Sequence, residues 1–255
     1  MPRAALESAR PIAERALELD PHLAHAHLAV AIIRAMLDWD WEGAEAGFRQ
    51  AIELNPSSDG AHRWYGLVLA GLGRSSEAVR EAQRAHELDP LCLVTGTCAA
   101  WAEYMAGEYQ PAIDTCRMVM EMQHGFSPAW RVLGASLIQM GRVAEGVAEL
   151  ETAAIASTDS VLLAWLAHAK AICGECGVAR TILAALDGMR QERFVPAYHL
   201  ALAHVGLGDT DEAFRQLDLA CEERDPALIN LNRDPRFDPI RSDVRFSALR
   251  DRLHL

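Results

Sequence analysis

The sequence predicts an all-α fold, a right-handed solenoid built from helix-turn-helix repeats. Five glycines recur at intervals of 34, 34, 33 and 34 residues, and these are Gly73, Gly107, Gly141, Gly174 and Gly208. Small residues keep the same interval five positions after each glycine, at Ala78, Ala112, Gly146, Ala179 and Ala213. A period of this length is typical of stacked helical repeats. No segment alternates apolar and polar residues between turn signals, so we expect no strands.

The first repeat is incomplete. Residues 1–21 have the pattern of the second helix of a repeat whose first helix is missing, and Pro21 ends that helix. Six full repeats are then expected, with bounds of 22–56, 57–90, 91–124, 125–158, 159–190 and 193–226. The half-repeat leaves an apolar edge that is a candidate surface for a homodimer or for an upstream domain. Residues 1–226 form the predicted solenoid domain.

Within a repeat, apolar residues spaced three and four apart predict the first helix, as in residues 131–140. Glycine ends that helix because its backbone accepts the left-handed conformation that turns the chain. The second helix then begins with capping residues. Asp209 with Glu212 has the pattern of a capping box, in which each group satisfies a backbone N–H. Ser75 or Ser76 is expected to cap an earlier repeat in the same way.

Residues 227–255 are expected to cap the solenoid and to pack on its last repeat. A stack of repeats exposes an apolar face at its end, which a polar-faced cap must cover. The side chains expected to pack inward are Phe237, Phe246, Leu249 and Leu253.

At this point the chain resembles the tetratricopeptide-repeat (TPR) family, whose repeats are helix pairs of this length. The match is best where Trp130, Leu133 and Gly134 precede Gly141 and Ala153. Glu103 and Lys170 depart from it, since the family prefers an aromatic residue at both positions. The resemblance implies a non-catalytic scaffold that binds proteins or peptides on its concave face.

Two segments narrow the resemblance. Residues 38–44, which carry a one-residue insertion, and residues 234–246 are similar to the C-terminal repeat regions of bacterial signalling proteins. Such regions typically follow a winged-helix DNA-binding domain, an adenylate cyclase domain or a Ser/Thr kinase domain. The alternative function is therefore a regulatory or sensor region whose effector domain is absent from this sequence, and no activity of those domains can be assigned to its residues.

In the TPR family, the first helix of each repeat lines the concave groove. Transferring that pattern gives the candidate peptide-binding residues, which are Arg63, Leu67, Trp101, Tyr104, Arg131, Ile138, His168 and Tyr198. We expect a partner segment with apolar anchors on Trp101 and Tyr104 and an acidic group on Arg63 or Arg131. Packing between repeats is the competing interpretation of Trp101. The Lys and Asn clamp of chaperone-tail binders is missing here.

Composition excludes several classes of protein. The net charge of −12 argues against nucleic-acid binding, which depends on lysine and arginine neutralising phosphates. The sequence has neither a long apolar run nor a signal peptide, so we expect a cytoplasmic protein without a membrane partner. Its six cysteines are then expected to be reduced thiols.

No cofactor or metal is expected. Cys173 and Cys176 form a single C-x-x-C at a repeat turn, without the second pair that a zinc site needs. The spacing of His22, His25 and His27 does not gather three rings on one helical face. We therefore predict a protein with no catalytic residues.

Overall fold

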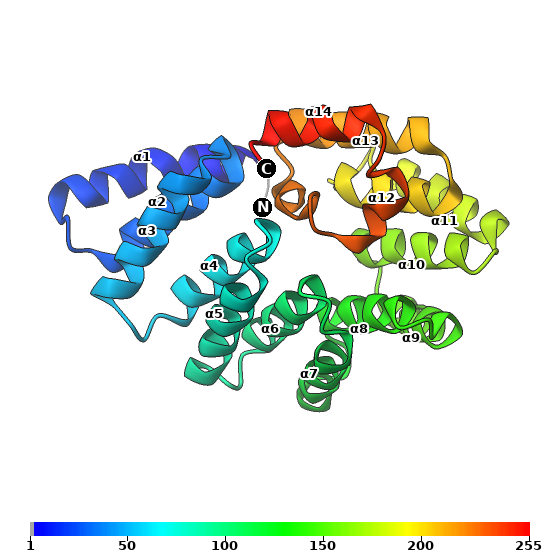
Figure 1. Cartoon of the computed structure of the whole chain (residues 1–255), viewed down its shortest axis with the longest axis horizontal. Coiled ribbons are helices and arrows are strands. Elements are labelled where there is room, and N and C mark those ends of the chain that lie inside the picture. Colours follow the sequence, from blue (N-terminus) through cyan, green and yellow to red (C-terminus); the bar gives the residue numbers. More distant parts are fainter. Residues whose placement is uncertain (1–2) are drawn as a thin grey trace.

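The computed structural model describes residues 3–255 (Figure 1). Its elements are α1 (Arg3–Leu19), α2 (Ala24–Ile33), η1 (Arg34–Asp38), α3 (Trp41–Leu54), α4 (Asp59–Gly71), α5 (Ser75–Leu88), α6 (Leu93–Met105), α7 (Tyr109–Met122), α8 (Ser127–Gln139), α9 (Val143–Ala156), α10 (Ser160–Ile172), α11 (Cys176–Met189), α12 (Ala197–Leu207), α13 (Thr210–Glu223), η2 (Pro226–Asn230), η3 (Pro235–Ile240) and α14 (Val244–Leu253). Residues 3–255 contain no strand, and the predicted all-α solenoid is confirmed.

Six helix pairs, from α2 with α3 to α12 with α13, follow the predicted repeats within residues 3–255. The turn between the two helices of a pair depends on glycine in five of them. Those glycines adopt φ between 75° and 92°, a region that side chains with a Cβ rarely enter. They are the five that keep the repeat interval: Gly73, Gly107, Gly141, Gly174 and Gly208.

Small residues let the two helices of a pair approach closely. A Cβ added to Gly66 of α4 would lie only 3.0 Å from the backbone nitrogen of Ala82 in α5. Ala78 and Ala82 of α5 are completely buried at the same contact. The small residues that set the sequence period therefore mark helix crossings.

The expected caps are wrong in detail. Asp209 occupies the N-cap position of α13, but its side chain makes no capping hydrogen bond. Helix α5 begins at Ser75 with Arg74 as its N-cap, again without a side-chain bond. Arg74 instead pairs its side chain with Glu77 of the same helix and with Glu45 of the preceding repeat.

The C-terminal segment, residues 226–255, contacts more than the last repeat. Figure 1 shows it leaving α13, passing through the inside of the arc formed by the repeats, and ending beside the N-terminal helices. All four side chains expected to face inward are buried, namely Phe237, Phe246, Leu249 and Leu253. Helix α14 packs along α13, where the Arg245 guanidinium lies 4.2 Å from the Phe214 ring centroid.

The two ends of the solenoid meet. The indole Nε1 of Trp41, at the start of α3, donates a buried 2.8 Å hydrogen bond to the carbonyl of Leu253. The Arg224 guanidinium lies 3.7 Å from the ring centroid of Trp39. Both tryptophans belong to residues 38–44, so this segment joins the first repeat to the end of the chain. In residues 3–255, no helix combines the length and apolar character needed to cross a bilayer.

Candidate functional site

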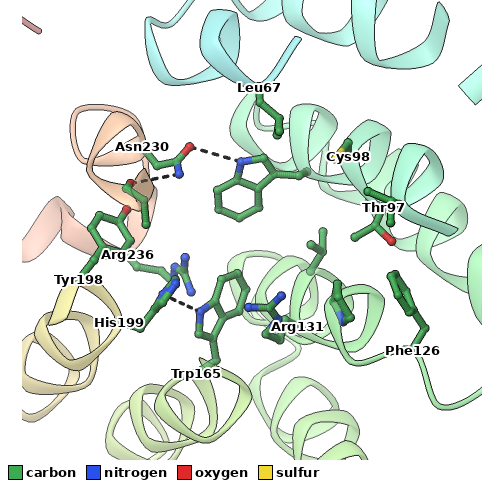
Figure 2. A pocket seen from close by; sticks show the side chains of 15 residues that line it. Leu67, Thr97, Cys98, Phe126, Arg131, Trp165, Tyr198, His199, Asn230 and Arg236 are labelled. Atoms are coloured by element: carbon green, nitrogen blue, oxygen red, sulfur yellow. Dashed lines mark hydrogen bonds between the residues drawn. The ribbon is translucent and has the colours of Figure 1, made fainter. Parts of the chain in front are cut away.

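A pocket of about 290 Å³ opens on the inner face of the arc (Figure 2). The first helices of five consecutive repeats contribute to it, and the C-terminal segment forms its remaining wall. The lining residues are Leu67, Val94, Thr97, Cys98, Trp101, Phe126, Pro128, Arg131, Val132, Trp165, Tyr198, His199, Ala227, Asn230 and Arg236. This mostly apolar lining with a few polar groups is the usual make-up of a ligand site.

Two tryptophans form the centre of the pocket. The ring centroids of Trp101 and Trp165 are 5.9 Å apart, so the rings touch and leave no room for a group between them. Both indole N–H groups already have acceptors. Trp101 donates to Asn230 Oδ1 at 3.4 Å and Trp165 donates to His199 Nδ1 at 3.1 Å, as the dashed lines in Figure 2 show. The tryptophans therefore offer a ligand an apolar surface rather than hydrogen bonds.

A buried ion pair attaches the C-terminal segment to this face. Arg236 donates from Nε and Nη2 to the two carboxylate oxygens of Asp234, at 2.9 and 2.7 Å. Tyr198 of α12 donates its hydroxyl to the same carboxylate at 3.0 Å. The guanidinium also stacks over Trp165, 3.6 Å from its ring centroid. Burial acts to raise the pKa of Asp234, but Arg236 and these hydrogen bonds hold that pKa below its ordinary value.

Arg131 of α8 has no such partner. Its Nε is buried without a hydrogen-bond acceptor in residues 3–255, and its guanidinium lies 5.6 Å from the Trp165 ring centroid. Burial lowers the pKa of Arg131, and the charge of Asp159 offsets this only in part. Arginine nevertheless stays charged in proteins. The pocket therefore holds one cation without a paired carboxylate.

The other titratable groups of the lining are neutral. Burial, with the charges of Arg131 and Arg236, holds the pKa of His199 well below its ordinary value. Because His199 Nδ1 accepts from Trp165, the proton of its neutral ring sits on Nε2. Burial also raises the pKa of the Cys98 thiol to about 11, so this cysteine is not a reactive thiolate.

The structure brings half of the predicted site residues to this pocket, namely Leu67, Trp101, Arg131 and Tyr198. Tyr104 is fully buried and stacks on Trp101. His168 is buried too, and donates from Nδ1 to the carbonyl of Leu202. Ile138 is partly buried and lies with His168 at a narrow internal gap beside Arg236.

Arg63 lies outside the pocket lining, with its guanidinium 5.1 Å from the Trp64 ring centroid. Its charge acts on Cys98, whose thiol belongs to the lining.

Sequence reasoning did not select Trp165, His199, Asn230 or Arg236. The first two carry a usable signal, because Arg63, Thr97, Arg131, Trp165 and His199 follow one another at intervals of 34 residues. They occupy one position of the repeat, and four of the five line the pocket. Asn230 and Arg236 carry no comparable signal, since they lie beyond the last repeat.

The C-x-x-C pair has no metal-site geometry in the structure. Cys173 is exposed, and its thiol bonds to the carbonyl of Lys170. Across residues 3–255, no three His, Cys, Asp or Glu side chains converge as metal ligands would.

Searches with the sequence find neither a matching family model nor a matching curated protein. The structure, in contrast, is similar to several solved repeat proteins. A tetratricopeptide repeat protein from Parabacteroides merdae superposes with a TM-score of 0.65 at 13% identity, over 87% of this chain and 88% of that one. PilW, a type IV pilus biogenesis factor, gives 0.61 at 21% identity over 76% and 89% of the two chains. PilF of Pseudomonas aeruginosa gives 0.54 at 18% identity over 90% and 97%.

Proposed function

Because the chain has the fold of tetratricopeptide-repeat proteins, we propose that it is a non-catalytic interaction module that binds a short segment of a partner protein on its concave face. One observation carries the proposal. Part of the predicted groove is occupied by the C-terminal segment, which covers Tyr198 with Asp234 and Phe237, while the pocket beside Trp101 stays open. The bound segment therefore inserts one residue into the pocket instead of lying along the whole groove.

Val94 and Leu91 provide a matched pair of variants for testing this proposal. Both are exposed apolar residues near the start of α6, with 43% and 81% of their surface accessible, and only Val94 lines the pocket. Peptides of random sequence are selected on the wild-type chain by display, and their affinities are measured by fluorescence polarisation. We expect Val94→Glu to weaken the selected peptides about tenfold or more, and Leu91→Glu to leave them unchanged.

Peptides that bind Val94→Glu as tightly as wild type would place the binding surface elsewhere. Failure to select any peptide that binds above background would contradict the interaction function itself.

The alternative proposal is a regulatory region of a bacterial signalling protein. It is favoured by the two segments that resemble such regions. Residues 38–44 and 234–246 both take part in closing the arc, through Trp41 at one end and the Asp234–Arg236 pair inside it. An antibody against this chain distinguishes the two proposals in cells of the source. A band near 28.0 kDa supports a freestanding module, and a much larger band supports a regulatory region.

A further inference from the structure

We propose that the pocket binds a single carboxylate carried on a compact apolar body, with the carboxylate held by Arg131 and Arg236. The inference rests on the proposed interaction function and specifies the chemistry of its ligand. Two sources share this chemistry: the C-terminal residue of a partner chain, and a free organic acid of the same size.

The unsatisfied hydrogen-bond donors of the pocket point to an anion. Nε of Arg131 and Nη1 of Arg236 are both buried without an acceptor in residues 3–255. Arg236 cannot turn Nη1 toward Asp234, because Nε and Nη2 of the same planar group already hold that carboxylate. Buried polar atoms in native proteins nearly always have partners, so these unpaired N–H groups on two arginines that both line the pocket need an explanation. A bound carboxylate supplies acceptors for both.

The charges in the pocket set the number of carboxylates at one. Asp234 neutralises Arg236, while His199 and Cys98 are neutral, which leaves Arg131 as the uncompensated charge of the lining. A cation left unpaired in a partly apolar site is costly. A ligand with one negative charge offsets that cost, and a neutral ligand does not.

The size and the apolar lining set the rest of the ligand. Since a water occupies about 30 Å³, a cavity of about 290 Å³ holds about ten waters, or one apolar residue of a peptide. Val94, Phe126 and Pro128 line the cavity together with the tryptophans, so the ligand needs an apolar body. An aspartate or glutamate side chain brings the charge but leaves this apolar surface uncovered. A terminal apolar residue brings both the carboxylate and the apolar body.

The experiment uses two pairs of ligands that differ only in charge. The first is 3-phenylpropionate with its amide, and the second is a tetrapeptide ending in phenylalanine with a free or an amidated C-terminus. Binding to the full chain is followed by calorimetry and by its tryptophan fluorescence, to which Trp101 and Trp165 of the pocket contribute. We expect each acid to bind about tenfold tighter than its amide, which is the scale of a charge-assisted contact. The tighter of the two acids identifies the source of the ligand.

Arg131→Met removes the unpaired cation, and Arg117→Met makes the same change on an exposed residue of α7, outside the pocket. We expect the preference for acid over amide to disappear in Arg131→Met and to persist in Arg117→Met. A purely structural Arg131 would instead lower the unfolding midpoint when replaced. We expect no such loss, because the replacement breaks no ion pair. Val94→Glu, which adds a negative charge at the pocket, is a second variant that should abolish acid binding.

Equal binding of acid and amide, or acid binding that survives Arg131→Met, would overturn the inference. If display-selected peptides still depend on Val94 in that case, the interaction function stands and only the carboxylate assignment fails. If the free acid binds while no peptide can be selected, the pocket chemistry stands and the interaction function fails.

Discussion

Replacing Asp234 by asparagine tests how the C-terminal segment is held inside the arc. The side chains of Arg236 and Asp234 are 3% and 0% exposed, and the variant leaves the guanidinium buried without a counterion. Breaking a buried ion pair from one side typically costs about 3–5 kcal/mol. We expect a loss of that size in the free energy of unfolding, measured by urea denaturation. The tryptophan fluorescence of the chain should change as well, because Arg236 stacks on the ring of Trp165.

The control lies four residues further along the same segment. Asp238 pairs with Arg241 at 2.8 Å, but 63% of its side chain is exposed, so Asp238→Asn should cost less than about 1 kcal/mol. Combining Asp234→Asn with Arg236→Met should recover much of the lost stability, because removing both charges leaves neither one unpaired. If Asp234→Asn cost no more than Asp238→Asn, the ion pair would not hold the segment in place.

Three further predictions concern the same framework. The stability difference between wild type and Asp234→Asn should narrow as the pH falls below about 3.9. The folded state lowers the pKa of Asp234, so the stabilisation that its carboxylate provides is lost as acid protonates it. Urea titrations at several pH values measure the difference in stability, and a constant difference would contradict the prediction. Gly71→Ala should lower the free energy of unfolding by about 1–3 kcal/mol, because the added Cβ would lie 2.5 Å from the Ile229 carbonyl oxygen. The control is Gly177→Ala, whose Cβ would meet no atom within 4 Å, and this variant should be neutral or stabilising in thermal unfolding. Burial raises the pKa of Glu103, so Glu103→Gln should raise the free energy of unfolding by about 0.5–1 kcal/mol at pH 7. The gain should shrink toward about pH 4, because the wild-type carboxyl becomes protonated there. An equal gain at both pH values would refute burial of the charge as the cause.

The repeats could be predicted because their signals are local. Gly141 marks its turn by a backbone conformation that other residues rarely adopt, and the position is fixed by that conformation alone. Gly66 marks a helix crossing because it has no side chain, which lets the backbone of α5 approach α4 closely. Capping was less predictable, since Asp209 stands at the N-cap position of α13 and its side chain still makes no capping hydrogen bond.

The position of the C-terminal segment could not be predicted in the same way. In the sequence, Asp234 and Arg236 look like ordinary surface charges, and their burial depends on Tyr198 and Trp165, which lie in two different repeats. Arg131 was selected from the repeat pattern as a groove residue. Its lack of a partner depends on where the other charges around the pocket lie, and the repeat pattern does not fix their positions.

The pocket and the closure of the arc depend on each other. Arg131 belongs to α8 and Arg236 to the C-terminal segment, so the two arginines line one pocket only while that segment is in place. A ligand that is held by both arginines must then stabilise the arrangement in which the C-terminal segment lies inside the arc. The free energy of this stabilisation grows with the ratio of the ligand concentration to its Kd. Saturating acid should therefore restore part of the stability that Asp234→Asn loses, although Asp234 is not part of the pocket lining.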